Sequence, residues 1–67
     1  MLPAEHGSLL FWINRERLRG TPENARAARL TEVLREDTGN RRLSVTRVEP
    51  ILDSEGELQG YLAFARP

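Results

Sequence analysis

The clearest pattern of apolar and polar positions lies in residues 21–39, where apolar side chains recur at the spacing of an α-helix. On a helical wheel one side carries Ala27, Leu30, Val33 and Leu34, and polar side chains dominate the opposite side. The segment therefore predicts one amphipathic surface helix, whose apolar stripe needs a second layer to pack against.

Both ends of this helix carry sequence signals. We expect Thr21 at the N-cap, Pro22 in the first helical position and Glu23 near the positive end of the helix dipole. Gly39, or Asn40 after it, is expected to close the helix in a left-handed conformation.

Residues 8–19 fit either a strand or a helix. The run LLFWI is rich in strand-forming residues, and its shortness and the break at Gly20 favour a strand; a helix capped by Ser8 is the alternative. In a strand, one face carries Leu9, Phe11 and Ile13, and the other carries Leu10, Trp12 and Leu18.

Two more strands are predicted after the helix. Residues 41–52 form the first of them, with a bulge near Thr46–Arg47 where the alternation shifts, and Pro50 belongs on a sheet edge or at a bulge. Residues 53–56 predict a hairpin turn, and residues 57–66 the last strand, in which Gly60 either weakens the strand or permits a close approach. The two faces of that strand carry Leu58, Leu62 and Phe64, and Tyr61, Ala63 and Ala65.

This order of elements predicts a single α+β domain over residues 1–67, with residues 1–7 as a flexible tail. The expected fold is a small two-layer β-α-β-β sandwich with one helix packed on a three-stranded mixed sheet. A crossover helix makes the first two strands parallel, and the hairpin adds an antiparallel one. No segment remains to cover the second sheet face, where we expect Leu10, Trp12 and Tyr61 to form a contact surface.

Composition narrows the function classes. The chain has 67 residues and no cysteine. Its ten basic residues, all arginine, balance ten acidic residues, so no net charge attracts it to nucleic acid or to a membrane. The apolar run 9–13 is too short to span a bilayer, and we expect a cytoplasmic protein. A GC-rich coding bias explains the arginines as readily as selection for bidentate contacts does.

Catalytic signals are weak. His6 is the only histidine and lies in the predicted tail, the serines lack a nucleophile-elbow context, and the glycines form no phosphate loop. The carboxylates of residues 49–57 lack the spacing of a calcium loop. We therefore expect no enzyme activity, no cofactor and no metal site.

Arginine clusters suggest nucleic-acid binding as an alternative function, with Trp12 or Tyr61 stacking on bases. In a strand Arg15, Arg17 and Arg19 would project from one face. A second cluster would comprise Arg41, Arg42 and Arg47.

Two resemblances accompany these patterns. Residues 13–30, with RGTPENARAARL at their centre, resemble the last strand and helix of many KH RNA-binding domains, although the GXXG loop that clamps RNA in that family is absent. The strand–helix–hairpin layout with SVTRVEP is similar to small phage proteins that inhibit host machinery, among them anti-CRISPR proteins and an RNA polymerase inhibitor.

The leading hypothesis is a non-enzymatic binding or regulatory module that works through protein contacts. The chain is expected to form a homodimer through the uncovered sheet face or an edge, because its own core is small. A phage-type inhibitor of a host protein is a version of the same hypothesis.

Overall fold

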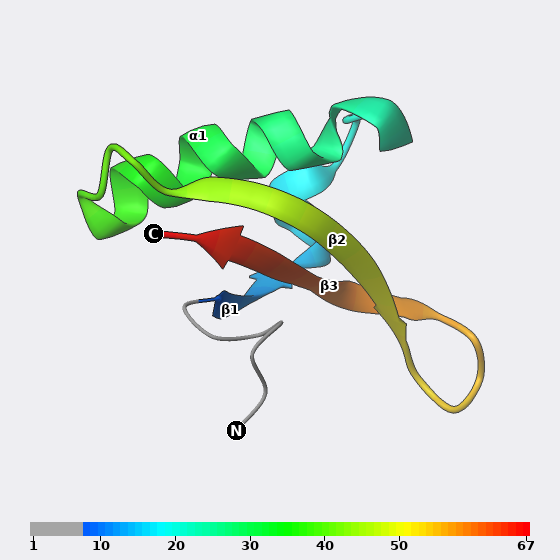
Figure 1. Cartoon of the computed structure of the whole chain (residues 1–67). Helices are drawn as coiled ribbons and strands as arrows, with labels where there is room; N and C mark the ends of the chain where they lie inside the picture. Colours follow the sequence, from blue (N-terminus) through cyan, green and yellow to red (C-terminus); the bar gives the residue numbers. More distant parts are fainter. Residues whose placement is uncertain (1–7) are drawn as a thin grey trace, which may run out of the picture.

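The structure, a computed structural model, describes residues 8–67, in which one α-helix and two short 3-10 helices accompany three strands (Figure 1). The predicted tail at residues 1–7 lies outside the described residues. In chain order the elements are β1 (Leu9–Asn14), η2 (Arg15–Leu18), η3 (Glu23–Ala25), α1 (Arg26–Thr38), β2 (Ser44–Leu52) and β3 (Leu58–Arg66). The predicted α+β fold is confirmed: α1 packs on one face of a three-stranded sheet.

The pairing of the strands differs from the expected mixed sheet, which would contain one parallel pair of neighbours. The sheet has the order β1-β3-β2, with β3 between the other two strands in Figure 1, and both neighbouring pairs are antiparallel. β1 and β2 do run in the same direction, as predicted, but β3 lies between them. A physical reason is that Pro50 removes a ladder donor from β2, whereas β3 contains no proline and offers an uninterrupted second edge to β1.

The hairpin between β2 and β3 follows the sequence signals. The register shifts between Val45 and Arg47, which confirms the predicted bulge, and Pro50 lies on an edge strand as expected. Gly56 closes the turn with a φ of 82°, and its N–H donates to the carbonyl of Asp53 at 3.0 Å.

The helix does not start as predicted, but it ends at Gly39 as predicted. Pro22, in an extended conformation, occupies the cap of the short helix η3, and no side chain caps it, so Thr21 is not the N-cap. Instead the N–H of Thr21 closes a turn by donating to the carbonyl of Leu18 at 2.9 Å. At the other end Gly39 has a φ of 75° and donates to the carbonyl of Arg35 at 2.9 Å.

The core lies between α1 and the inner sheet face. Leu30 and Leu34 of the predicted stripe are buried, with Ala27 and Val33 half-buried beside them. The small side chains on the inner face of β3 leave room for the larger ones. The buried apolar residues are Ile13, Leu18, Leu30, Leu34, Leu43, Val45, Tyr61, Ala63 and Ala65.

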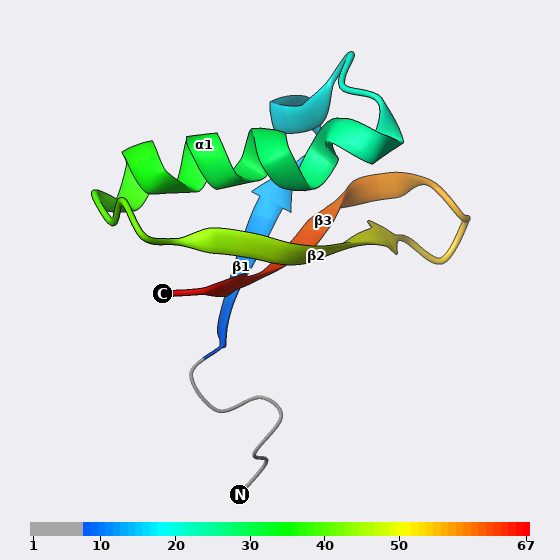
Figure 2. The same cartoon turned by 45° about the horizontal axis from the view of Figure 1, so that its top comes forward.

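The helix α1 runs beside β2 in Figure 2, and polar contacts of two of its side chains hold it there. The Thr31 hydroxyl donates to the Ala27 carbonyl at 2.8 Å and accepts from the N–H of Val45 at 3.0 Å. Nε of Arg35 donates to the carbonyl of Leu43 at 2.7 Å. These bonds satisfy backbone groups at the start of β2, where the bulge interrupts the ladder.

Residues 8–19 contain both a strand and a short helical turn. The β1 strand ends at Asn14, whose side chain accepts a hydrogen bond from the N–H of Glu16 at 2.9 Å and so caps η2. The turn brings Leu18 into the core beside Ile13. The expectation that Leu18 shares a strand face with Leu10 and Trp12 is therefore wrong.

Candidate functional site

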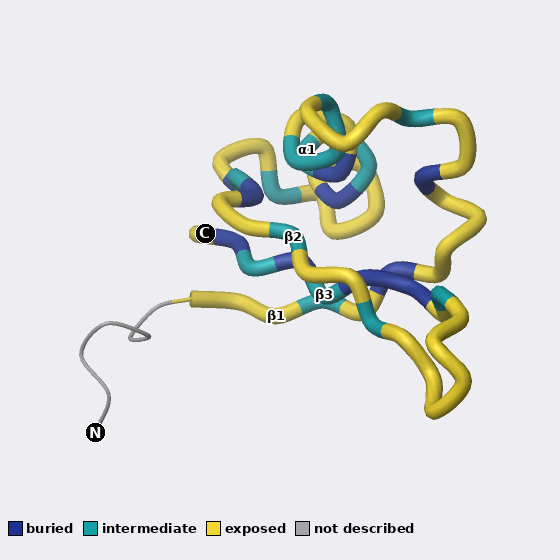
Figure 3. The backbone as a smooth tube through the Cα atoms, turned by 90° about the vertical axis from the view of Figure 1, so that its right-hand side faces the viewer, coloured by how far each residue is buried: buried dark blue, intermediate teal, exposed yellow. Residues whose placement is uncertain are grey.

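The candidate contact surface is β1, the most exposed strand of the sheet. Its only well-buried side chain is Ile13, and the tube of β1 is exposed along most of its length in Figure 3. One edge of β1 pairs with β3, and no strand among residues 8–67 pairs with the other. The strand is thus open on its outer face, partly on its inner face, and along one backbone edge.

Two apolar side chains project from the outer face of this strand, and we call them the β1 patch: Leu10 and Trp12. Leu9, which is also exposed, lies on the inner face with Ile13. Leu10 is 59% exposed and Trp12 is 54% exposed, which confirms that both lie on the uncovered side of the sheet. In the register of the sheet Leu10 is opposite Phe64, and Trp12 is opposite Leu62. These half-buried partners extend the apolar surface onto β3.

Gly60 shapes the surface beneath Trp12. A Cβ at position 60 would meet the indole atoms Cη2 and Cζ2 of Trp12 at 2.6 and 2.7 Å, and it would also contact the carbonyl oxygen of Ile13. The missing side chain therefore lets the indole ring lie across β3. Of the two roles expected for Gly60, the structure shows the close approach.

Tyr61 is not part of the contact surface. It is 4% exposed and belongs to the core, on the inner face with Ala63 and Ala65. The sequence correctly placed these three residues on one face of β3, but that face packs toward α1. The two alanines are the signal that identifies it, because small side chains let a helix approach a sheet closely. Leu62 and Phe64, which sequence reasoning did not assign to the surface, lie on the outer face instead.

The opposite edge of the sheet, β2, carries features that discourage strand pairing. Pro50 lacks an N–H, the bulge at residues 45–47 interrupts the regular backbone, and two charged side chains project from the strand. Arg47 lies over the ring of Phe64 at 4.1 Å and contacts Glu49 at 3.5 Å. The β1 segment contains no charged residue and no proline.

The first arginine cluster of the nucleic-acid alternative is not a row on a strand face. Arg15 and Arg17 belong to η2 and Arg19 follows it. Arg17 pairs with Asp37 at 2.8 Å and Arg19 pairs with Glu16 at 3.1 Å. In the second cluster Arg41 and Arg42 are exposed in the turn before β2, whereas Arg47 is held on the sheet.

The acidic hairpin is organised by hydrogen bonds. The Asp53 carboxylate accepts from the N–H of Glu57 at 2.9 Å, from the N–H of Glu55 at 2.8 Å and from the amide of Gln59 at 3.1 Å. The Glu57 and Glu55 bonds, together with the Gln59 bond and the nearby charge of Arg15, hold the pKa of Asp53 below its ordinary value.

No group of three or more His, Cys, Asp or Glu residues within positions 8–67 is placed to hold a metal ion. His6 lies outside the described residues. No helix between residues 8 and 67 has the length and apolarity to cross a bilayer.

Comparisons with family models, curated protein sequences and solved structures found no match to this chain.

Proposed function

We propose that the protein is a non-enzymatic binding module whose partner is a second copy of the same chain, joined along β1. The observation that supports this most strongly is the combination found in this strand: an unpaired backbone edge, an exposed apolar patch and no charge. An edge strand with these properties is a template for adding another strand.

The contrast between the two edges supports β1 rather than β2 as the contact strand. Natural sheets protect free edges with charges, prolines and bulges, and β2 has all three. Because β1 carries no charge, two copies of it can approach without electrostatic repulsion. Pairing would also bring outer-face side chains of the two copies into contact at the seam, which shields part of the apolar surface of Leu10 and Trp12 from water.

Strand alternation restricts the geometry of such a dimer. Two copies related by a twofold axis would pair antiparallel, so that directly opposed residues point to the same side of the joined sheet. The outer-facing Leu10 must then oppose an outer-facing residue of the second copy. The result is a six-stranded sheet with both helices on one side. The other side carries Leu10 and Trp12 of both copies near the seam, and Arg47 and Glu49 farther out on each β2.

Sedimentation equilibrium with two matched variants tests the proposal. Leu10 and Leu52 have similar exposures, 59% and 56%, but lie on opposite edge strands. We expect a dimer for the unmodified chain at micromolar concentration, a monomer for Leu10→Lys, because a charge on a free edge opposes pairing, and a dimer for Leu52→Lys. A monomeric unmodified chain, or equal effects of the two substitutions, would contradict the proposal.

The nucleic-acid alternative has less support from the contacts. Arg17, Arg19 and Arg47 each pair with a carboxylate, which leaves fewer uncompensated guanidinium groups for phosphates than the sequence suggested. Surface pairs of this kind are weak, so a direct measurement is still informative. Binding of single-stranded RNA that falls steeply with salt, by an unmodified chain that remains monomeric, would favour this alternative.

A further inference from the structure

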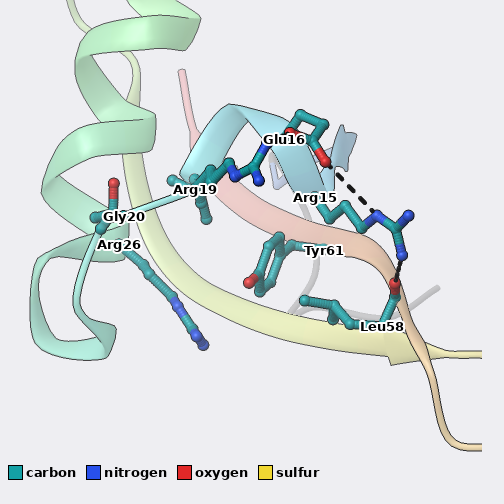
Figure 4. Close-up of a pocket in the computed structure, with 9 residues that line it drawn as sticks. Arg15, Glu16, Arg19, Gly20, Arg26, Leu58 and Tyr61 are labelled. Carbon is teal, nitrogen blue, oxygen red and sulfur yellow. Dashed lines mark hydrogen bonds and ion pairs between the residues drawn. The ribbon is translucent and has the colours of Figure 1, made fainter.

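A second feature, separate from the β1 patch, is a pocket of about 360 Å³ between η2, the loop that follows it, the start of α1 and β3. Its charged side chains all come from residues 15–26, β3 adds the uncharged Leu58 and Tyr61, and no residue of the β1 patch lines it. The lining residues that matter chemically are Arg15, Glu16, Arg19, Arg26, Leu58 and Tyr61 (Figure 4).

Arg26 is the most informative of these residues. Its guanidinium carbon lies 4.9 Å from the centre of the Tyr61 ring, so the aromatic face supports the cation. Its Nε atom is buried and has no hydrogen-bond partner among the described residues. Because Nε is enclosed by the protein, the terminal guanidinium nitrogens are the donors that Arg26 can offer to a ligand in the pocket.

The other two arginines add positive charge around the same space. Nη1 of Arg15 donates to the carbonyl of Leu58 at 2.9 Å, and Arg19 pairs with Glu16 at 3.1 Å. Glu16 also lies 3.9 Å from Arg15, so one carboxylate serves two guanidinium groups. The pocket thus has three arginines against one glutamate, in a chain whose charges cancel overall.

We propose that this pocket binds a phosphate group, either free or as a phosphomonoester. Guanidinium groups donate paired hydrogen bonds to phosphate oxygens, and a tetrahedral anion presents acceptors to donors that approach from several directions. A dianion also matches the excess positive charge of the pocket. Arg26 donates from its terminal guanidinium nitrogens, and Arg19 turns from its exposed pair with Glu16 toward the anion, which costs little because such pairs are weak. Leu58 and Tyr61 offer apolar surface to the organic part of an ester.

The test is a titration of the ¹⁵N-labelled chain with inorganic phosphate at constant ionic strength, followed by the shifts of the amide and arginine Nε–H signals. We expect saturable binding with a Kd on the order of 1 mM, and shifts confined to the pocket. Arg26→Gln should weaken binding about tenfold, the effect of losing one charge-assisted hydrogen bond. Arg29→Gln is the matched control, because Arg29 lies on the same helix and does not line the pocket, and it should change Kd by less than about twofold.

A second variant keeps the test independent of folding. Arg19 is 82% exposed at its side chain, so Arg19→Gln should fold normally and weaken binding about threefold. Phenyl phosphate distinguishes the two sources: tighter binding than inorganic phosphate indicates an ester, and equal binding indicates the free anion. Absence of saturable binding, equal effects of Arg26→Gln and Arg29→Gln, or unchanged binding by Arg19→Gln would overturn the proposal.

Discussion

Leu30 is the side chain on which the contact between α1 and the sheet is centred, because it is completely buried. Leu30→Ala should destabilise the fold by about 2–5 kcal/mol through lost apolar burial and the cavity left behind. A domain of this size has only about 3–5 kcal/mol to lose, so the variant should be largely unfolded in thermal melts. Glu32→Ala, on the exposed side of the same helix, should change stability by about 0.5 kcal/mol or less. Equal melting temperatures for the two variants would refute the assigned helix face.

On the outer face, Gly60 is the residue at which an added methyl group should destabilise the fold most. Gly60→Ala would press against the Trp12 ring and the backbone of Ile13, and we expect a loss of about 1–3 kcal/mol together with a change in tryptophan fluorescence. In the Trp12→Leu background the same substitution should cost less, because only the backbone contact remains. Chemical denaturation of the four proteins measures both effects, and a Gly60→Ala variant as stable as the unmodified chain would contradict the close approach.

At the scale of elements, the β2–β3 hairpin depends on the ionised form of Asp53. The pKa of this group is lowered by folding, so the stability that it contributes is present above the ordinary aspartate pKa of about 3.9 and is lost as the pH falls through the lowered folded-state value. Asp53→Asn removes the charge and retains one acceptor oxygen. We expect melting temperatures of this variant to vary less with pH below about 4 than those of the unmodified chain. Parallel pH profiles for the two proteins would show that Asp53 does not contribute in this way.

The elements also show where local sequence signals suffice. Gly39 and Gly56 were predictable because each occupies a backbone conformation that glycine adopts readily, and the bulge of β2 was visible as a shift in alternation. The prediction of Thr21 as the N-cap was wrong because a residue with a good capping side chain does not always cap a helix. Pro22 has an extended conformation, and the helix begins after it. Residues 8–19 were ambiguous because they contain a strand and a helical turn in succession.

At the scale of the whole molecule, local signals did not determine which strands pair or which sheet face meets the helix. A helix crossover fixes the direction of β1 relative to β2, but not whether β3 lies between them. The phase of β3 placed Tyr61 correctly beside Ala63, yet only the packing against α1 decided that this face is the inner one. The exposure of Leu10 and Trp12 could be predicted because the elements within residues 8–67 are too few to cover both faces of the sheet.

Disulfide formation in single-cysteine variants of residues 9–12 tests whether β1 joins two copies of the chain, as we propose. The chain has no cysteine, so each introduced thiol can cross-link only to another copy. In a twofold antiparallel pair one residue lies opposite itself, at a Cα separation of about 4.5–5.5 Å that suits a disulfide, and its neighbours lie farther from their own copies. We predict rapid cross-linking at one of these four positions and slow cross-linking at the others and at Leu52→Cys. Four variants that oxidise no faster than Leu52→Cys would contradict the claim.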